Sequence, residues 1–197
     1  MTRFDEAIAG IDAANSADPN RVLLDGKEVP AELVYGQRMT AMLDRVYPGS
    51  SEALRLAVRA QHIRRWEIPR ANYPMDRPGY LRWRKELGRK HAEWTGEILA
   101  RCGYDAEDVA RVGSLLRKEN LRKDAETQAL EDVAALVFLE HYAADFAGKH
   151  EPDKVVTILA KTLSKMSEHG KAVAAGLDLP PPVRNALEAA VTQASAS

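Results

Sequence analysis

Cysteine is nearly absent from the sequence, and long apolar runs are absent altogether. Cys102 is the single cysteine in 197 residues, which excludes an intrachain disulfide and a cysteine-rich zinc site. The longest uninterrupted apolar run covers residues 133–139, far short of the roughly 20 residues that a membrane-spanning helix needs. We therefore expect no membrane partner.

The sequence also has little net charge and no apolar leader. A formal charge of -1 gives no overall attraction to polyanions, so any affinity for phosphate or nucleic acid requires a local cluster of charge. Asp5 and Glu6 lie where a signal peptide would carry its apolar segment, which predicts a cytoplasmic protein. With 45% hydrophobic and 29% charged residues, the composition is that of a folded globular chain.

Apolar residues recur mainly with the period of a helix. His91, Trp94 and Ile98 begin one such stripe, Asp105 is the expected N-cap of the next helix, and residues 126–146 predict a long buried helix. The Asp-Gly pair within residues 22–29 is typical of a hairpin turn, but its flanks are short. We expect an ordered loop there and an all-α fold overall.

The positive charge of the chain is concentrated in one segment. Residues 59–90 contain ten Lys or Arg and three acids, a local charge of +7, so the rest of the chain totals -8. Arginine forks match phosphate oxygens, and the interleaved tryptophans suit stacking of a base. The same pattern also fits core tryptophans beside a solvated arginine face, or an extended nucleic-acid surface. The candidate binding residues are Arg59, Arg64, Arg65, Trp66, Arg82, Trp83, Arg84 and Lys118.

One acid and two histidines are candidates for a metal site. Asp132 stands at the start of a fully apolar stretch, where an unpaired carboxylate costs several kcal/mol. Its partner is expected to be a metal, a protonated histidine, or an inward Arg or Lys. His62 and His91 face inward by the helical period and have basic neighbours. Two imidazoles and a carboxylate can bind Zn, Mn, Fe or Ni.

This spacing resembles that of the HD-domain superfamily of helical metal-dependent phosphohydrolases. Residues 54–69 resemble the helix with the family's His-Asp doublet, with Gln61 and His62 at the two positions. His91 resembles the histidine that opens a later helix, and Asp132 resembles the last metal-binding aspartate. Tyr35 stands where the family has another histidine. Residues 61–87 and the run through Lys118, Asp124 and Glu131 also resemble an uncharacterised bacterial and fungal family of unknown function.

The resemblance implies a single-domain helical bundle of about seven to eight helices spanning residues 1–197. Its HD-like core would cover about residues 30–147, preceded by a helix and loop at 1–30 and followed by helices at 152–193. The implied activity is hydrolysis of a phosphate ester or nucleotide by water on a divalent metal held by His62, His91 and Asp132. The catalytic base is unassigned.

Two other interpretations of the same residues remain open. A non-catalytic module on this fold could use the basic pocket to bind an anion, a nucleotide or RNA. Alternatively, the chain could be a scaffold that binds a protein partner and no small ligand, which is the third interpretation after the hydrolase and the binding module. A small phosphate-containing ligand is the expected partner in the first two interpretations.

Overall fold

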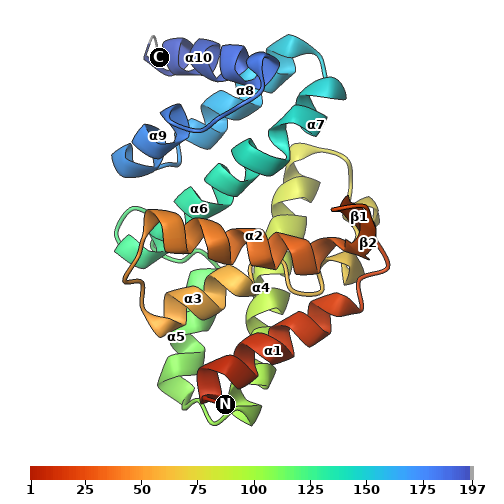
Figure 1. The fold of residues 1–197 in the computed structure, drawn as a ribbon, viewed down its shortest axis with the longest axis vertical. Helices are drawn as coiled ribbons and strands as arrows, with labels where there is room; N and C mark the ends of the chain where they lie inside the picture. The colour runs from red at the N-terminus through yellow and green to blue at the C-terminus, as the bar shows by residue number, and fades with distance from the viewer. Residues whose placement is uncertain (196–197) are drawn as a thin grey trace. The chain divides into compact units, whose positions relative to one another are not determined.

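The computed structural model describes residues 1–195 and is built almost entirely of helices (Figure 1). By chain contacts it divides into two compact units, Met1–Thr127 (unit 1) and Gln128–Ser197 (unit 2). No helix in the described part of the chain is long and apolar enough to cross a membrane. The elements in chain order are α1 (Arg3–Ser16), β1 (Arg21–Leu24), β2 (Lys27–Pro30), α2 (Ala31–Val46), α3 (Glu52–Arg59), the 3-10 turns η1 (Arg65–Glu67) and η2 (Arg70–Asn72), α4 (Arg77–Arg101), α5 (Ala106–Leu116), α6 (Ala125–His141), α7 (Ala143–Gly148), α8 (Pro152–Leu163), α9 (Glu168–Ala175) and α10 (Pro181–Ser195).

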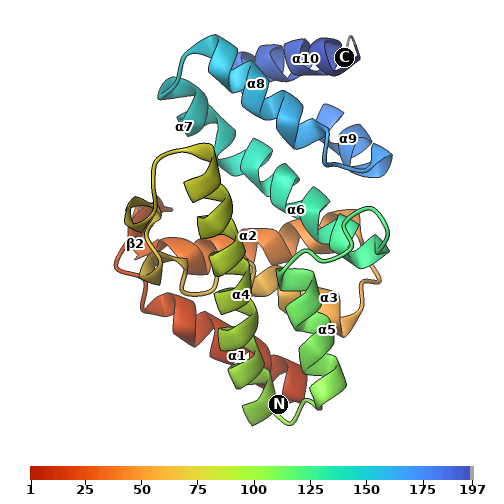
Figure 2. The same ribbon diagram turned by 180° about the vertical axis from the view of Figure 1, so that it is seen from behind.

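Unit 1 is organised around the pair α4 and α5, which lie side by side in both ribbon views (Figure 2). Asp76 caps α4 through the Gly79 N–H, and Asp105 caps α5, as its sequence predicts. α3 packs against α5 and α2, and α1 contacts α2, α3 and α4. These contacts bury the unit's core, which includes Ile11, Met39, Leu43, Leu56, Ile63, Leu99 and Leu115.

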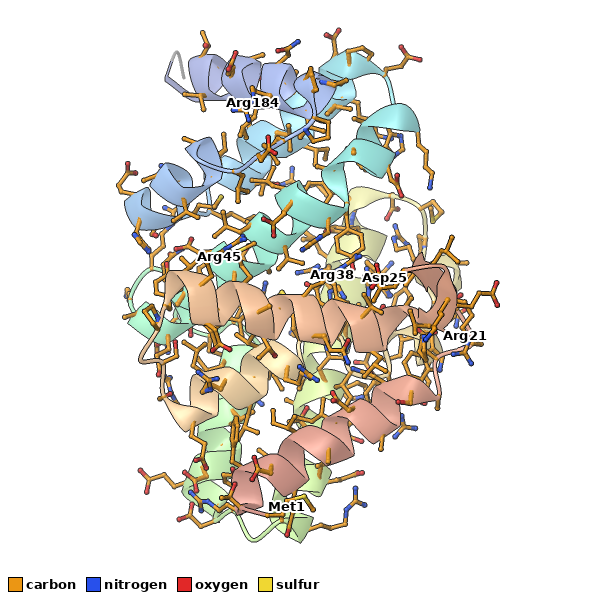
Figure 3. The ribbon with its side chains drawn as sticks, viewed as in Figure 1. Met1, Arg21, Asp25, Arg38, Arg45 and Arg184 are labelled. Carbon is orange, nitrogen blue, oxygen red and sulfur yellow. The ribbon has the colours of Figure 1, made fainter. Side chains whose placement is uncertain are left out.

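The segment expected to be an ordered loop is instead a β-hairpin. β1 and β2 pair antiparallel with Leu24 opposite Lys27. Asp25 and Gly26 between them both have positive φ, as a two-residue hairpin turn requires. The pair contacts α2, so the short strands do not stand alone. Figure 3 labels Arg21 and Asp25 on this hairpin.

Unit 2 is wholly helical over its described residues. α8 packs along α10, and α7 contacts both. The single helix predicted over residues 126–146 is interrupted at Tyr142, whose φ of -128° and ψ of -20° separate α6 from α7. No Pro or Gly stands at this break, so the sequence carries no signal for it.

Asp132, on α6, is fully buried and hydrogen-bonded within unit 2. Ser167 donates both its backbone N–H, at 2.8 Å, and its hydroxyl to the carboxylate, and the Gln128 amide donates at 3.1 Å. The Ser167 hydroxyl also accepts the Gly170 N–H and so caps α9. These three donors are neutral groups, which were not among the partners expected for Asp132.

Gly170 lies against this buried carboxylate, and we predict that a side chain at this position is destabilising. A Cβ built at Gly170 would lie 2.6 Å from Asp132 Cγ, whereas one at Gly176 meets only ordinary contacts. Gly170→Ala is therefore expected to lower the free energy of unfolding by about 1–3 kcal/mol, and Gly176→Ala to change it by less than about 0.5 kcal/mol. Urea denaturation of both variants measures this, and equal effects would contradict the close approach.

The all-α prediction is confirmed, because the described residues form ten α-helices and only two four-residue strands. The predicted count of seven to eight helices was too low. Turns after Arg59 and at Tyr142 shorten two of the predicted helices. The division at Thr127 falls inside the range 30–147 that the HD resemblance marks as one core. The HD relationship and the single-domain organisation stay predictions.

Candidate functional site

Unit 1 contains a pocket of about 740 Å³ bounded by α4, the turn that follows α3 and the segment that follows α5. This volume is within the range of sites that enclose small molecules. Its lining residues are Gln61, His62, Tyr73, Arg82, Arg84, Lys85, Glu86, Leu87, Gly88, Arg89, His91, Leu116, Arg117, Lys118 and Glu119.

The pocket lining is strongly cationic. It contains six Lys or Arg side chains and two carboxylates, an excess of four positive charges. The two carboxylates are already engaged, since Glu86 accepts from Arg89 and Glu119 accepts from Arg117. Within residues 1–195, Arg82, Arg84 and Lys85 on α4 make no hydrogen bond or ion pair. The α4 side of the pocket therefore offers three uncompensated cations.

The segment between α5 and α6 has an unusual backbone conformation that other residues hold in place. Lys118, Asn120 and Arg122 all have positive φ, a conformation that side-chain-bearing residues rarely adopt. Arg111 on α5 holds the end of this segment by donating to both oxygens of Asp124 and to Glu126. These hydrogen bonds also hold the pKa of Asp124 well below its usual value. The anchor fixes the segment that carries Lys118.

His62 lies in the turn after α3 and is packed on several sides. The Tyr35 ring stacks on the imidazole with centroids 3.9 Å apart, and Glu32 Oε2 lies 3.2 Å from its Nδ1. Arg65 approaches the same nitrogen at 3.5 Å while its guanidinium lies over the Trp83 ring. Burial, followed by the charge of Arg65, lowers the pKa of His62 well below its usual value. His62 is therefore a neutral imidazole.

His91, on α4, is 4% exposed, and its ring centroid lies 6.2 Å from that of His62. Burial, with the charges of Arg65 and Arg84, lowers its pKa to about 3. The ring is hydrogen-bonded to the backbone of Gln61, while its Nε2 has no partner within the described chain. The bond to Gln61 is therefore made by Nδ1–H, which leaves an unshared electron pair on Nε2.

A long-range contact explains why His62 stands in a turn. Arg64 adopts the left-handed conformation, with φ of 51° and ψ of 31°, and its N–H donates to Asn15 Oδ1 on α1. Asn15 is 1% exposed and also donates to the Glu32 carbonyl. One α1 side chain thereby links the turn that carries His62 to the start of α2, which carries Glu32.

Glu32 makes a testable contribution to the pH dependence of stability. Burial, with the nearby charge of Asp18, raises its pKa from 4.5 to about 7. Because the folded chain then binds this proton more tightly than the unfolded chain, ionisation of Glu32 between pH 4.5 and about 7 favours unfolding. Glu32→Gln removes this effect. The free energy of unfolding of Glu32→Gln, measured relative to that of the wild type, should therefore increase as pH rises from 5 to 8.

Urea denaturation at the two pH values measures the gain from Glu32→Gln. Glu28→Gln, at an exposed position on β2, is the matched control. Its free energy of unfolding should differ from that of the wild type by the same amount at pH 5 and pH 8. A Glu32→Gln variant whose offset from the wild type is the same at pH 5 and pH 8 would contradict the raised pKa.

The structure brings together five of the residues predicted from sequence and separates the others. His62, His91, Arg82, Arg84 and Lys118 line the pocket, and Arg65 lies beside His62. The other four basic or aromatic candidates lie outside the lining. These residues are Arg59, Arg64, Trp66 and Trp83.

Specific contacts account for three of the residues outside the lining. Arg59 donates to both carboxylate oxygens of Asp12 and to Thr40. Arg64 pairs with Glu67 and lies over the Trp94 ring. Trp83 is 7% exposed and its indole N–H donates to the Ile68 carbonyl at 2.8 Å. Trp83 is therefore a core residue, as one of the alternatives drawn from the sequence proposed, whereas Trp66 is half-buried.

Several residues of the site escaped sequence reasoning. Glu32 was unremarkable at the start of an amphipathic helix, although it lies three residues before Tyr35, so that both can reach one partner. Lys85 lies among the other basic residues of α4 and was a visible candidate. Gln61 was considered only as a replacement for a ligand, yet its side chain lines the pocket and is 6% exposed.

The predicted metal ligands do not form one cluster within a single unit. His62 and His91 belong to unit 1, and Asp132 belongs to unit 2, where Ser167 and Gln128 occupy its oxygens. In the part of the chain that the structure describes, no group of three or more His, Cys, Asp or Glu side chains is placed to hold a metal. Binding of a divalent metal by these three residues stays a prediction.

Fold and site together define a mostly helical protein with a pocket lined by cationic side chains. The chain matches, over residues 5–187, the family described as a domain of unknown function, DUF4202, and it belongs to that family. No curated protein and no solved structure matches the sequence.

Proposed function

We propose that unit 1 binds a small molecule carrying a phosphate group in the pocket beside α4. The observation that carries this proposal is the set of three cations, Arg82, Arg84 and Lys85, that line the pocket without an acidic partner within residues 1–195. Arg82 and Lys85 are three residues apart on α4 and repel one another, Arg84 adds a third positive charge to the same pocket, and a bound anion relieves that repulsion. The two carboxylates in the pocket lining, Glu86 and Glu119, are already paired with Arg89 and Arg117. We therefore expect the anion that balances the three cations to be a bound ligand.

Phosphate fits these cations better than a simple halide or a single carboxylate does. Arginine presents two parallel N–H donors that match two oxygens of one tetrahedral group, and lysine adds a point charge that tolerates several directions. The neutral state of His62 and His91 matters as well, because neither imidazole adds charge that would draw the anion away from α4. A concave pocket of this volume favours a small molecule over an extended RNA strand.

Phosphohydrolase activity is a second candidate, favoured by the unshared electron pair on His91 Nε2. His62 and His91 would be the pocket's imidazole ligands for a divalent metal, and such a metal would orient phosphate and lower the pKa of bound water. The excess of cations opposes a divalent ion in the same pocket until an anion is present. Binding of phosphate is therefore the better supported function, and a cytoplasmic location remains part of the proposal.

Thermal unfolding with added ligand tests the binding function. We expect inorganic phosphate, pyrophosphate and common nucleotides to raise the Tm, by an amount that grows with the logarithm of concentration above the dissociation constant. Arg82→Ala should reduce the shift strongly, because a bidentate pair to a charged group contributes about 1.5–3 kcal/mol. It should leave the ligand-free Tm within a few degrees of the wild type.

Arg21→Ala is the matched control, because Arg21 is an exposed arginine of unit 1 on the hairpin and lies outside the pocket lining (Figure 3). It should keep the full ligand-induced shift. An unchanged shift in Arg82→Ala, or none in the wild type at millimolar ligand, would refute the proposal. Incubation of the nucleotides with protein and added Mn²⁺ or Zn²⁺, followed by a free-phosphate assay, separates hydrolysis from binding.

A further inference from the structure

The imidazole of His62 has one nitrogen held by a neighbour and the other open. Glu32 Oε2 lies 3.2 Å from Nδ1, and the Tyr35 ring covers one face of the imidazole. Nε2 has no hydrogen-bond partner within residues 1–195, yet it is not among the buried unpaired atoms, so it is accessible. The side chain is 15% exposed and lines the pocket. The accessible edge of the ring, with Nε2, therefore faces the pocket.

The Glu32 carboxylate fixes which nitrogen of His62 carries the proton. An ionised carboxylate only accepts hydrogen bonds, so Nδ1 is the donor and Nε2 keeps an unshared electron pair. The same carboxylate stabilises the positive charge that develops on the ring when Nε2 forms a bond. Glu32 is itself held in place, because its backbone N–H donates to Asp18 and its carbonyl accepts from Asn15. This is the arrangement of an activated and oriented nucleophile.

The charges around His62 suit the attack of this nucleophile on a phosphoryl group. Burial lowers the pKa of His62 most, and Arg65, Arg84 and Lys118 lie close enough for their charges to lower it further. These cations draw a phosphate toward the ring and stabilise the charge on its oxygens during transfer. They also keep the ring unprotonated, so its electron pair stays available. The transition state of phosphoryl transfer is loose, so a weakly basic nucleophile is sufficient.

We propose that His62 Nε2 accepts the phosphoryl group of a ligand bound in the pocket and that Glu32 positions it for this step. The inference rests on the proposed phosphate-binding function and adds a covalent reaction to it. Nε2 gives its electron pair to phosphorus, and the bond from phosphorus to the leaving group breaks. The leaving group departs with that bond's electron pair and, if it is an alkoxide, takes a proton from water. The ring becomes positively charged, and its Nδ1 proton is shared with Glu32.

Phosphoramidate is a small phosphoryl donor that tests the inference, because its nitrogen leaves as neutral ammonia and no further reactant is needed. The protein is incubated with it in EDTA at pH 8, above the pKa of Glu32, which burial raises to about 7. We expect one phosphoryl group on His62, located by mass spectrometry, in a linkage stable to base and labile to acid. His169, an exposed imidazole, is the internal reference, and His62 should react at least about 10-fold faster.

Three variants assign the reaction to this pair of side chains. His62→Asn should remove the label, and His169→Asn, the matched control, should leave the label on His62 unchanged. Glu32→Gln should slow labelling of His62 about 10-fold or more, because an amide neither fixes the tautomer nor balances the developing charge. Glu32 lies outside the pocket lining, so Glu32→Gln should keep the phosphate-induced rise in Tm. Slow labelling with that rise intact separates the positioning role of Glu32 from loss of folding or of binding.

Competition with inorganic phosphate distinguishes this inference from the function on which it rests. Phosphate should suppress labelling of His62 and leave that of His169 unchanged. A wild type whose Tm rises with phosphate, but whose His62 is labelled no faster than His169, overturns the inference while phosphate binding stands. Labelling of His62 that neither phosphate nor Glu32→Gln slows also overturns it. If the wild type shows no rise in Tm and no label on His62, both proposals are wrong.

Discussion

Asp132→Ala is expected to lower the free energy of unfolding by about 3–5 kcal/mol, because it removes several buried hydrogen bonds at once, leaves their donors unpaired and opens a cavity. The carboxylate is fully buried and accepts from Ser167 twice and from Gln128. Alanine would leave these donors facing a cavity and would loosen Ser167, which caps α9. Asp132→Asn keeps the shape and one acceptor oxygen, so we expect a smaller loss. Urea denaturation followed by far-ultraviolet circular dichroism measures both.

The same variant separates the structural role of Asp132 from its predicted role as a metal ligand. Asp153→Ala, at an exposed position in the first turn of α8, is the matched control and should cost about 0.5 kcal/mol. A stable Asp132→Ala variant that loses a stoichiometric metal carried by the wild type would contradict the hydrogen-bonding account and support the metal site. An unstable variant with no change in metal content is the expected result.

Arg59→Met is expected to destabilise the protein by about 2–4 kcal/mol, because Asp12 would lose a two-pronged partner in a largely buried position. The two side chains are only 11% and 27% exposed, and their N–O distances are 2.7 and 2.6 Å. The guanidinium also donates to Thr40. Arg59 thus links α3 to α1 and α2, and we expect its main role to be the stabilisation of unit 1.

Arg55→Met is the control for Arg59→Met on the same helix. Arg55 pairs with Asp44, but these side chains are 32% and 47% exposed, so the loss should stay below about 1 kcal/mol. Chemical denaturation gives the stabilities, and ligand titration of the folded Arg59→Met protein should give the wild-type affinity for phosphate esters. Loss of that affinity without loss of stability would return Arg59 to the binding site.

The helical class of the protein could be predicted from sequence because it rests on local periodicity. Asp105 and its acidic first turn mark the start of α5, and the stripe from His91 to Leu99 marks the second half of α4. The hairpin and the break at Tyr142 could not be predicted. The first gains its stability from contact with α2, and the second has no helix-breaking residue.

The basic half of the candidate site could also be predicted, because charge clustering is visible in the sequence. Arg82 and Arg84 both lie in the basic segment and within one turn of α4, so the sequence places them near each other, although helix periodicity alone does not put them on one face. The separation of Arg59 from the site depends on Asp12, 47 residues away, and the turn at His62 depends on Asn15. Such long-range contacts have no periodic signature in the sequence.

A crystal structure of the protein with tungstate, a tetrahedral oxyanion whose heavy atom can be located by anomalous scattering, tests the central claim most directly. The account predicts a single well-occupied anion in the pocket, within hydrogen-bonding distance of at least two of Arg82, Arg84 and Lys85. Tungstate bound elsewhere while the pocket stays empty would contradict the proposal that this pocket binds phosphate.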